Sequence, residues 1–137
     1  MLLKNPDRTE IKEVLDHAKT IAVVGLSPNP ARTSYMVSKA MQQAGYRIIP
    51  VNPMAEEVLG EKSYATLADI PEPVDIVNVF RRSEFLPAIA DDFLKIKAPV
   101  FWTQLNVVDE EVFNRLHAAG HTVIMDRCIK VEHAILK

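Results

Sequence analysis

A short stretch near the N-terminus contains residue types that together bind phosphate. Gly25 ends an apolar run, residues 21–24, and is followed by Ser27, Arg32 and Ser34. Glycine lets a ligand approach the backbone, a hydroxyl donates a hydrogen bond, and a guanidinium makes two parallel hydrogen bonds to a phosphate. A helix capped at Thr33 or Ser34 would also point its unpaired first-turn N–H groups at the same place. These residues predict a site for a phosphorylated nucleotide, although an ordinary strand-to-helix turn accounts for them equally well.

Two later segments offer further contacts for such a ligand. Phe80 and Pro53 present flat apolar surfaces on which a base could stack, and Arg81 adds a second cation next to Phe80. Strand alternation predicts that Arg81 and Arg82 point in different directions, one toward a cleft and one toward solvent. The structural interpretation of each residue is simpler: Phe80 belongs to the core, Arg32 and Arg82 form surface ion pairs, and Ser34 only caps a helix.

The elements that must position these residues alternate regularly along the chain. Apolar, β-branched runs predict five strands, and patterns of period 3.6 predict the helices between them. We therefore predict an α/β fold: a Rossmann-like three-layer α/β/α sandwich with a five-stranded, mainly parallel sheet of order 3-2-1-4-5. The predicted strands are residues 21–24, 47–51, 74–80, 99–102 and 122–126, and the main predicted helices are residues 7–19, 33–44, 84–95 and 110–119.

Ligands of such a sheet bind at the carboxyl ends of its strands, near the point where the strand order reverses. The loops that follow those ends begin at Gly25, Asn52, Phe80, Thr103 and Asp126. We expect the functional residues to lie in these five loops.

The composition is that of an ordinary globular protein. The chain has 137 residues, of which 48% are hydrophobic and 25% charged, and its net charge is −2. We therefore expect one domain, residues 1–137, without general attraction to nucleic acid or to anionic membranes. The single cysteine, Cys128, excludes an internal disulfide and a cysteine-cluster zinc site. Residues 1–5 do not form a signal peptide, and no apolar run reaches spanning length, so we expect a cytoplasmic protein.

A dinucleotide redox cofactor is one alternative, and the sequence argues against it. The Gly-x-Gly-x-x-Gly pattern is absent from the turn at Gly25, and no P-loop occurs in the chain. NAD-binding folds place an Asp or Glu after the second strand to hold the ribose diol, whereas this chain has Asn52. An NAD(P)-dependent oxidoreductase is therefore disfavoured.

A thiol enzyme is the other alternative. Cys128 and His133 could form a thiolate pair oriented by Asp126. A lone cysteine just after a buried strand is more often a small packed apolar residue, and no loop visibly supplies an oxyanion hole. We predict neither a catalytic residue nor a metal ligand, since no metal-ligand spacing occurs.

Several motifs, taken in their order along the chain, resemble the family of small stand-alone CoA-binding proteins. The single domain of that family is similar to the N-terminal, CoA-binding Rossmann domain of the succinyl-CoA synthetase α-subunit. The resemblance covers roughly residues 9–133. It is carried by residues 24–27 with Pro30, Arg32 and Ser34, by residues 49–53, by Gly60 with Tyr64, and by residues 67–71, 74–81 and 126–128.

The resemblance implies that CoA or an acyl-CoA lies across the strand ends. The residues that it implies for the phosphates are Gly25, Ser27, Arg32, Ser34 and Tyr35. Those that it implies for the adenosine and its 3′-phosphate are Val51, Asn52, Pro53, Phe80 and Arg81. The second domain of the synthetase, with its phosphorylated histidine, has no counterpart here, so ligase activity is not implied. We expect a non-catalytic binding or regulatory module.

Overall fold

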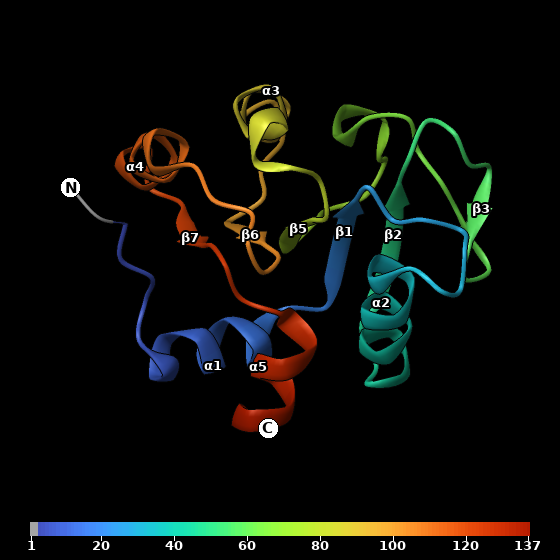
Figure 1. The fold of residues 1–137 in the computed structure, drawn as a ribbon, viewed down its shortest axis with the longest axis horizontal. Helices are drawn as coiled ribbons and strands as arrows, with labels where there is room; N and C mark the ends of the chain where they lie inside the picture. Colours follow the sequence, from blue (N-terminus) through green and yellow to red (C-terminus); the bar gives the residue numbers. More distant parts are fainter. Residues whose placement is uncertain (1–2) are drawn as a thin grey trace.

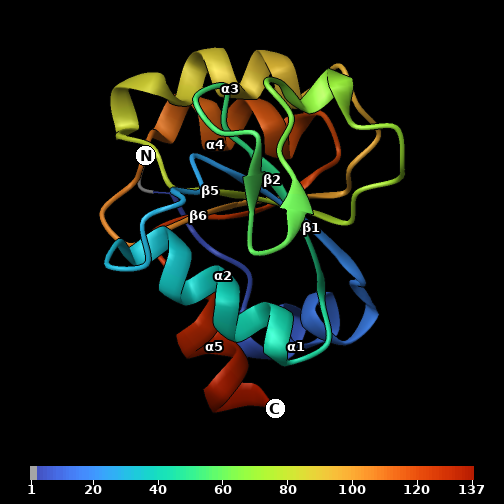
Figure 2. The same cartoon turned by 90° about the vertical axis from the view of Figure 1, so that its right-hand side faces the viewer.

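The computed structural model describes residues 3–137 and has the expected α/β fold. Five parallel strands form the main sheet: β1 (Thr20–Val24), β2 (Arg47–Val51), β5 (Ile76–Val79), β6 (Val100–Thr103) and β7 (Thr122–Ile124). Helices α1 (Arg8–His17), α2 (Thr33–Gln43) and α5 (Ile129–Leu136) cover one face, and α3 (Leu86–Phe93) and α4 (Glu110–Ala118) cover the other (Figures 1 and 2). The predicted three-layer architecture is confirmed.

Both faces of the sheet are buried, and the register sends alternate residues of each strand to two separate cores. Ala22, Val77, Phe101 and Val123 are aligned across four strands and pack beneath α3 and α4. On the opposite face, Ile21, Ile76 and Val100 are aligned and belong to the core under α1, α2 and α5. Because all residues of these strands except the first of β1, β2 and β7 are buried, the strands appear in the sequence as nearly continuous apolar runs.

The strand order is β2-β1-β5-β6-β7, with one further contact at the edge. Tyr64 forms a single parallel bridge with Val51, outside β2. When the Tyr64 bridge is counted as the third strand, the order across the sheet is 3-2-1-4-5-6. Its first five members reproduce the expected order 3-2-1-4-5, and β7 is the sixth. Residues 74–80, expected as the third strand, instead form the fourth and lie directly beside β1.

Pro50 lies inside β2 without interrupting the sheet. The N–H and C=O of one strand residue point to the same side, and the Pro50 carbonyl accepts a hydrogen bond from Tyr64 N–H (3.0 Å). The missing N–H of Pro50 would therefore have pointed toward Tyr64 and away from β1, so no hydrogen bond to β1 is lost.

Aspartate side chains cap two of the helices, and two elements were missed by the sequence analysis. Asp7 and Asp109 cap α1 and α4 by accepting from Glu10 and Val112 N–H groups, both at 3.0 Å.

The sequence did not reveal α5, or the hairpin of β3 (Glu57–Val58) and β4 (Glu61–Lys62). Two-residue strands are too short to show alternation. The remaining elements are the 3-10 turns η1 (Leu67–Asp69) and η2 (Ser83–Phe85), of which η2 precedes α3.

An exposed ion-pair cluster joins α1 to the C-terminus and gives a test of the pH dependence of stability. The Asp16 carboxylate accepts from Lys12 (2.8 Å) and from Lys137, and these hydrogen bonds lower its pKa from 3.8 to about 2. Because the pKa is lower in the folded state, the stabilisation is present above pH about 4 and is lost as the pH falls toward 2. Asp16→Asn should therefore lower the free energy of unfolding slightly near neutral pH, and this difference should vanish toward pH 2.

Urea unfolding at several pH values measures this difference. Glu57→Gln, which removes an exposed carboxylate from β3, should show no comparable convergence. A difference between wild type and Asp16→Asn that stays constant down to pH about 2 contradicts the assignment.

Candidate functional site

The loops at the carboxyl ends of the five strands form one edge of the molecule, which we call the carboxyl edge. It comprises residues 25–32, 52–54, 80–82, 104–109 and 126–128. After β1 the chain turns to α2 on one face of the sheet, whereas after β5 it turns to α3 on the other (Figure 1). The strand order therefore reverses between β1 and β5, and the loops there diverge, which is the geometry of a ligand-binding crevice.

Gly25 lies at this reversal point in close contact with the loop after β5. Its φ is +86°, and a Cβ atom at this position would lie 2.7 Å from the Phe80 carbonyl oxygen and 2.8 Å from Arg81 Cδ. The Gly25 N–H donates to the Val51 carbonyl of β2 (2.9 Å). Only glycine fits here, and the close approach brings together four of the predicted site residues.

The loop between β1 and α2 is held by its own side chains. Ser27 N–H donates to Ser34 Oγ (3.0 Å), and Asn29 N–H donates to Ser27 Oγ (3.1 Å). Ala31 N–H donates to Asn29 Oδ1 (3.0 Å). Both predicted serines therefore shape the loop, and Ser34 is buried.

The expected cap at Thr33 or Ser34 is wrong, because α2 already begins at Thr33 and Arg32 occupies the N-cap position. No side chain caps this end of the helix. Its first-turn N–H groups remain free to face an anion near Arg32. Tyr35 lies half-buried against the core beneath α2.

Asn52 connects the ends of β1 and β2. Its Nδ2 donates to the Leu26 carbonyl (2.9 Å), and its Oδ1 accepts from Met54 N–H (2.9 Å). The side chain of Val51 is buried in the core, so only its backbone reaches the edge, whereas Pro53 is exposed. The amide of Asn52 is thus used to fix the loops.

The arginines of residues 3–137 fall into two groups. Four form ion pairs with carboxylates, namely Arg8, Arg47, Arg82 and Arg115. The other three, Arg32, Arg81 and Arg127, have no carboxylate partner among the described residues, and all three lie on the carboxyl edge. Guanidinium groups without an internal counter-charge are available to a ligand phosphate.

Arg81 and Arg82 do not separate as alternation predicts, because both are exposed and the guanidinium carbons of both lie over the Phe85 ring, Arg82 at 5.4 Å from its centre. The stem of Arg81 covers Gly25, and its guanidinium carbon lies 4.5 Å from the centre of the Phe85 ring. Arg82 pairs with Glu84 (3.2 Å) on the surface. Phe80 is half-buried and packs against the core under α1, α2 and α5, so the interpretation of this residue as core is partly correct.

Gln104 is a site candidate that sequence reasoning did not single out. It follows β6, and its N–H donates to the Val79 carbonyl of β5 (3.1 Å). Its side-chain Oε1 is buried and accepts no hydrogen bond from the described residues. Buried acceptors almost always have a donor, so this oxygen is suited to a bound ligand or water. The sequence shows a polar residue at a strand end but cannot show an unsatisfied acceptor.

The thiol constellation is not assembled. Cys128 is buried at the N-cap of α5, and the ring of His133 lies edge-on against Tyr46, with the ring centres 5.7 Å apart. The Asp126 carboxylate instead accepts from Asn106 N–H (2.7 Å), and both of these residues have positive φ.

Within residues 3–137, no group of His, Cys, Asp and Glu side chains could hold a metal ion, and no helix has the length and apolar character to cross a membrane.

A parallel α/β sheet with a glycine turn at its reversal point and unpaired arginines beside it defines a Rossmann-like, nucleotide-binding class of protein. Residues 19–134 match the model of the family described as CoA binding domain, and the chain belongs to this family. The resemblance drawn from the motifs is thereby confirmed.

Individual relatives agree with this membership. The uncharacterized protein YneT of Bacillus subtilis is 59% identical over 98% of this chain and 100% of its own length. A solved Thermus thermophilus protein is 37% identical, with a TM-score of 0.92 over 96% of this chain and 100% of that one. The α-subunit of the ADP-forming acetate–CoA ligase II of Pyrococcus furiosus is 36% identical over 48% of this chain but only 15% of its own length.

The close contact at Gly25 can be tested by substitution. Gly25→Ala should cost about 2–4 kcal/mol of the free energy of unfolding, because a left-handed φ and a steric overlap with backbone add. Gly45→Ala is the matched control, since Gly45 also has a positive φ of +106° but has no atom within 4 Å of its Cβ position. Urea unfolding compares the two variants, and equal losses would show that the overlap with Phe80 and Arg81 contributes nothing.

Proposed function

We propose that the carboxyl edge binds coenzyme A or an acyl-CoA, and that the protein acts as a binding or regulatory module. The observation that carries the proposal is the position of Arg32, Arg81 and Arg127, the arginines without a carboxylate partner among residues 3–137, on this one edge. CoA carries a diphosphate and a 3′-phosphate, and charge-assisted bonds to guanidinium groups suit both. Membership in the CoA binding domain family supports the same ligand.

The diphosphate fits best at the uncapped start of α2. The first-turn N–H groups, the helix dipole and the Arg32 side chain all favour negative charge there. Gly25 offers no side chain between the loop and the ligand, while Ser27 and Ser34 hold the loop open. In this proposal, Arg81 binds the 3′-phosphate with its guanidinium kept in place by Phe85.

The adenosine end lies between the loops after β2 and β5 in this proposal, beside Pro53 and Phe80. Each polar atom of the Asn52 amide already makes one hydrogen bond within the loops, and the amide lacks the negative charge with which an Asp or Glu holds both hydroxyls of a ribose diol. This favours CoA, whose ribose 3′-position is phosphorylated, over NAD.

The pantetheine arm would extend along the carboxyl edge toward Gln104. The amide N–H groups of the pantetheine arm would donate the hydrogen bond that the buried Gln104 Oε1 lacks. The proposal of binding without covalent catalysis draws on the burial of Cys128 and on the contact of the His133 ring with Tyr46. The ligase subunits that match this chain are far longer, so their activity is not carried over.

Titration calorimetry with CoA, 3′-dephospho-CoA, NAD and NADP tests the proposal on the unmodified protein. CoA should bind, and 3′-dephospho-CoA should bind about 10- to 100-fold more weakly, because one charge-assisted contact contributes about 1.5–3 kcal/mol. Binding of NAD or NADP without binding of CoA would overturn the proposal and favour redox chemistry.

Arginine variants assign the phosphates. Arg32→Ala and Arg81→Ala should each weaken CoA binding about 10- to 100-fold without loss of folding, whereas Arg115→Ala, which removes a partner of Asp91 on α4, should not. If Arg81 binds the 3′-phosphate, the effect of Arg81→Ala should disappear when 3′-dephospho-CoA is the ligand. Unchanged CoA affinity in both edge variants would contradict the phosphate assignment.

A further inference from the structure

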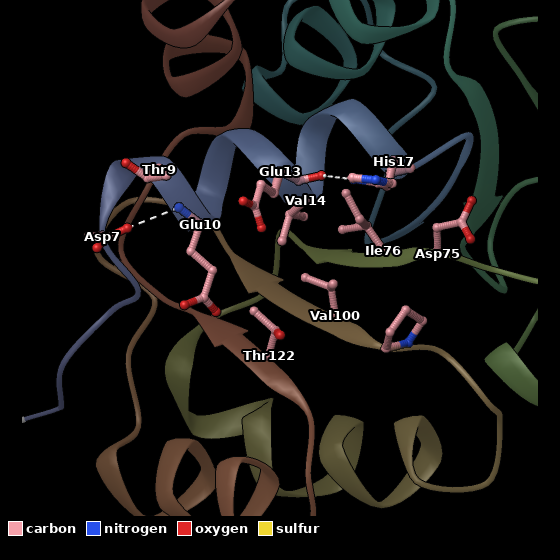
Figure 3. A pocket seen from close by; sticks show the side chains of 12 residues that line it. Asp7, Thr9, Glu10, Glu13, Val14, His17, Asp75, Ile76, Val100 and Thr122 are labelled. Carbon is pink, nitrogen blue, oxygen red and sulfur yellow. Dashed lines mark hydrogen bonds between the residues drawn. The ribbon is translucent and has the colours of Figure 1, made fainter.

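A cavity opens at the edge of the sheet opposite the carboxyl edge, where the strands begin. It has a volume of about 740 Å³ and lies between α1 and the amino ends of β5, β6 and β7 (Figure 3). We call it the amino-edge cavity. Its apolar lining includes Val14, Ile76 and Val100. This volume falls within the range of about 300–1,000 Å³ that small-molecule sites occupy.

The amino-edge cavity carries negative charge without an internal counter-ion. Asp7, Glu10, Glu13 and Asp75 line it, and no lysine or arginine does. Asp7 and Asp75 accept hydrogen bonds from backbone N–H groups, whereas the Glu10 and Glu13 carboxylates have no partner among the described residues. Many carboxylates elsewhere have a cationic partner, including Asp16, Glu61, Glu72, Glu84, Asp91 and Glu132.

The charges are distributed along the cavity. In Figure 3, Glu10 and Thr122 lie toward one end and His17 and Asp75 toward the other, with Ile76 between them. No three acidic or histidine side chains of residues 3–137 converge closely enough to hold a metal ion. Separated carboxylates with apolar surface between them suit an elongated organic cation instead of a compact inorganic one.

We propose that the amino-edge cavity binds an alkyl diamine or polyamine. The methylene chain lies on Val14, Ile76 and Val100, and the ammonium groups face Glu10 and Glu13 at one end and Asp75 at the other. This chemistry removes apolar surface from water and supplies the charge that the cavity lacks. The proposal is independent of CoA binding, because it concerns residues at the other edge of the sheet.

Amide NMR titration of the full chain with cadaverine and with spermidine tests this proposal. Saturable shifts are expected at the amides of Val14, Ile76 and Val100, but not at those of Gly25 and Arg81. Pentanediol, which has the same chain as cadaverine without its charges, should cause none of these shifts. Absence of saturable shifts at the cavity up to on the order of 10 mM amine would overturn the proposal.

A pair of charge-matched variants separates a built site from general attraction of cations. The Glu10→Gln/Glu13→Gln variant should weaken amine binding about tenfold or more, because both unpaired carboxylates of the cavity are lost. The control variant, Glu57→Gln/Glu111→Gln, removes two exposed carboxylates outside the cavity and should leave the affinity unchanged. Equal weakening in both variants, or none in either, overturns the proposal. These substitutions change exposed side chains, so folding is not at stake.

Discussion

The contact between Gly25 and the loop after β5 is the constraint on which the candidate site depends. A parallel sheet gains a crevice where neighbouring strands send their connections to opposite faces, and here those strands are β1 and β5. The backbone at Gly25 passes so close to the Phe80 carbonyl that no side chain fits. The same contact holds the stem of Arg81 over the loop, and it directs the chain toward the uncapped start of α2. The position of the loop and the position of the Arg81 stem therefore depend on the same contact.

The sequence was sufficient for the elements but not for their adjacency. Strands buried on both faces appear as apolar runs, and helices with one buried stripe show their period, so five strands and four helices could be predicted. Which strand lies beside β1 depends on the edge beyond β2, where a single bridge from Tyr64 occupies the place of a full strand. One bridge leaves no pattern in the sequence. The short helix α5 was missed because its residues invited a catalytic interpretation.

Polar residues of the candidate site were predicted by type, but their hydrogen-bond partners could not be. Ser34 and Asn52 have the chemistry of ligand contacts, yet their side chains accept from or donate to the backbone of neighbouring loops. Loop backbone must find partners when it is partly buried, and nearby Ser and Asn side chains supply them. Gln104 shows the converse, since its buried acceptor without a donor becomes visible only when the packing around it is known.

The net charge of −2 conceals an uneven distribution that the parallel fold makes possible. The five strands of the main sheet all begin at one edge and end at the other, so the residues before each strand gather at one edge and the residues after each strand gather at the opposite edge. Arginines without a carboxylate partner among residues 3–137 gather on the carboxyl edge, and four carboxylates line the amino-edge cavity, whose lining contains no lysine or arginine. A strand of four or five residues spans about 13–16 Å. Exposed charges interact weakly beyond about 8 Å at physiological ionic strength, so neither edge neutralises the other. The two edges can therefore select ligands of opposite charge.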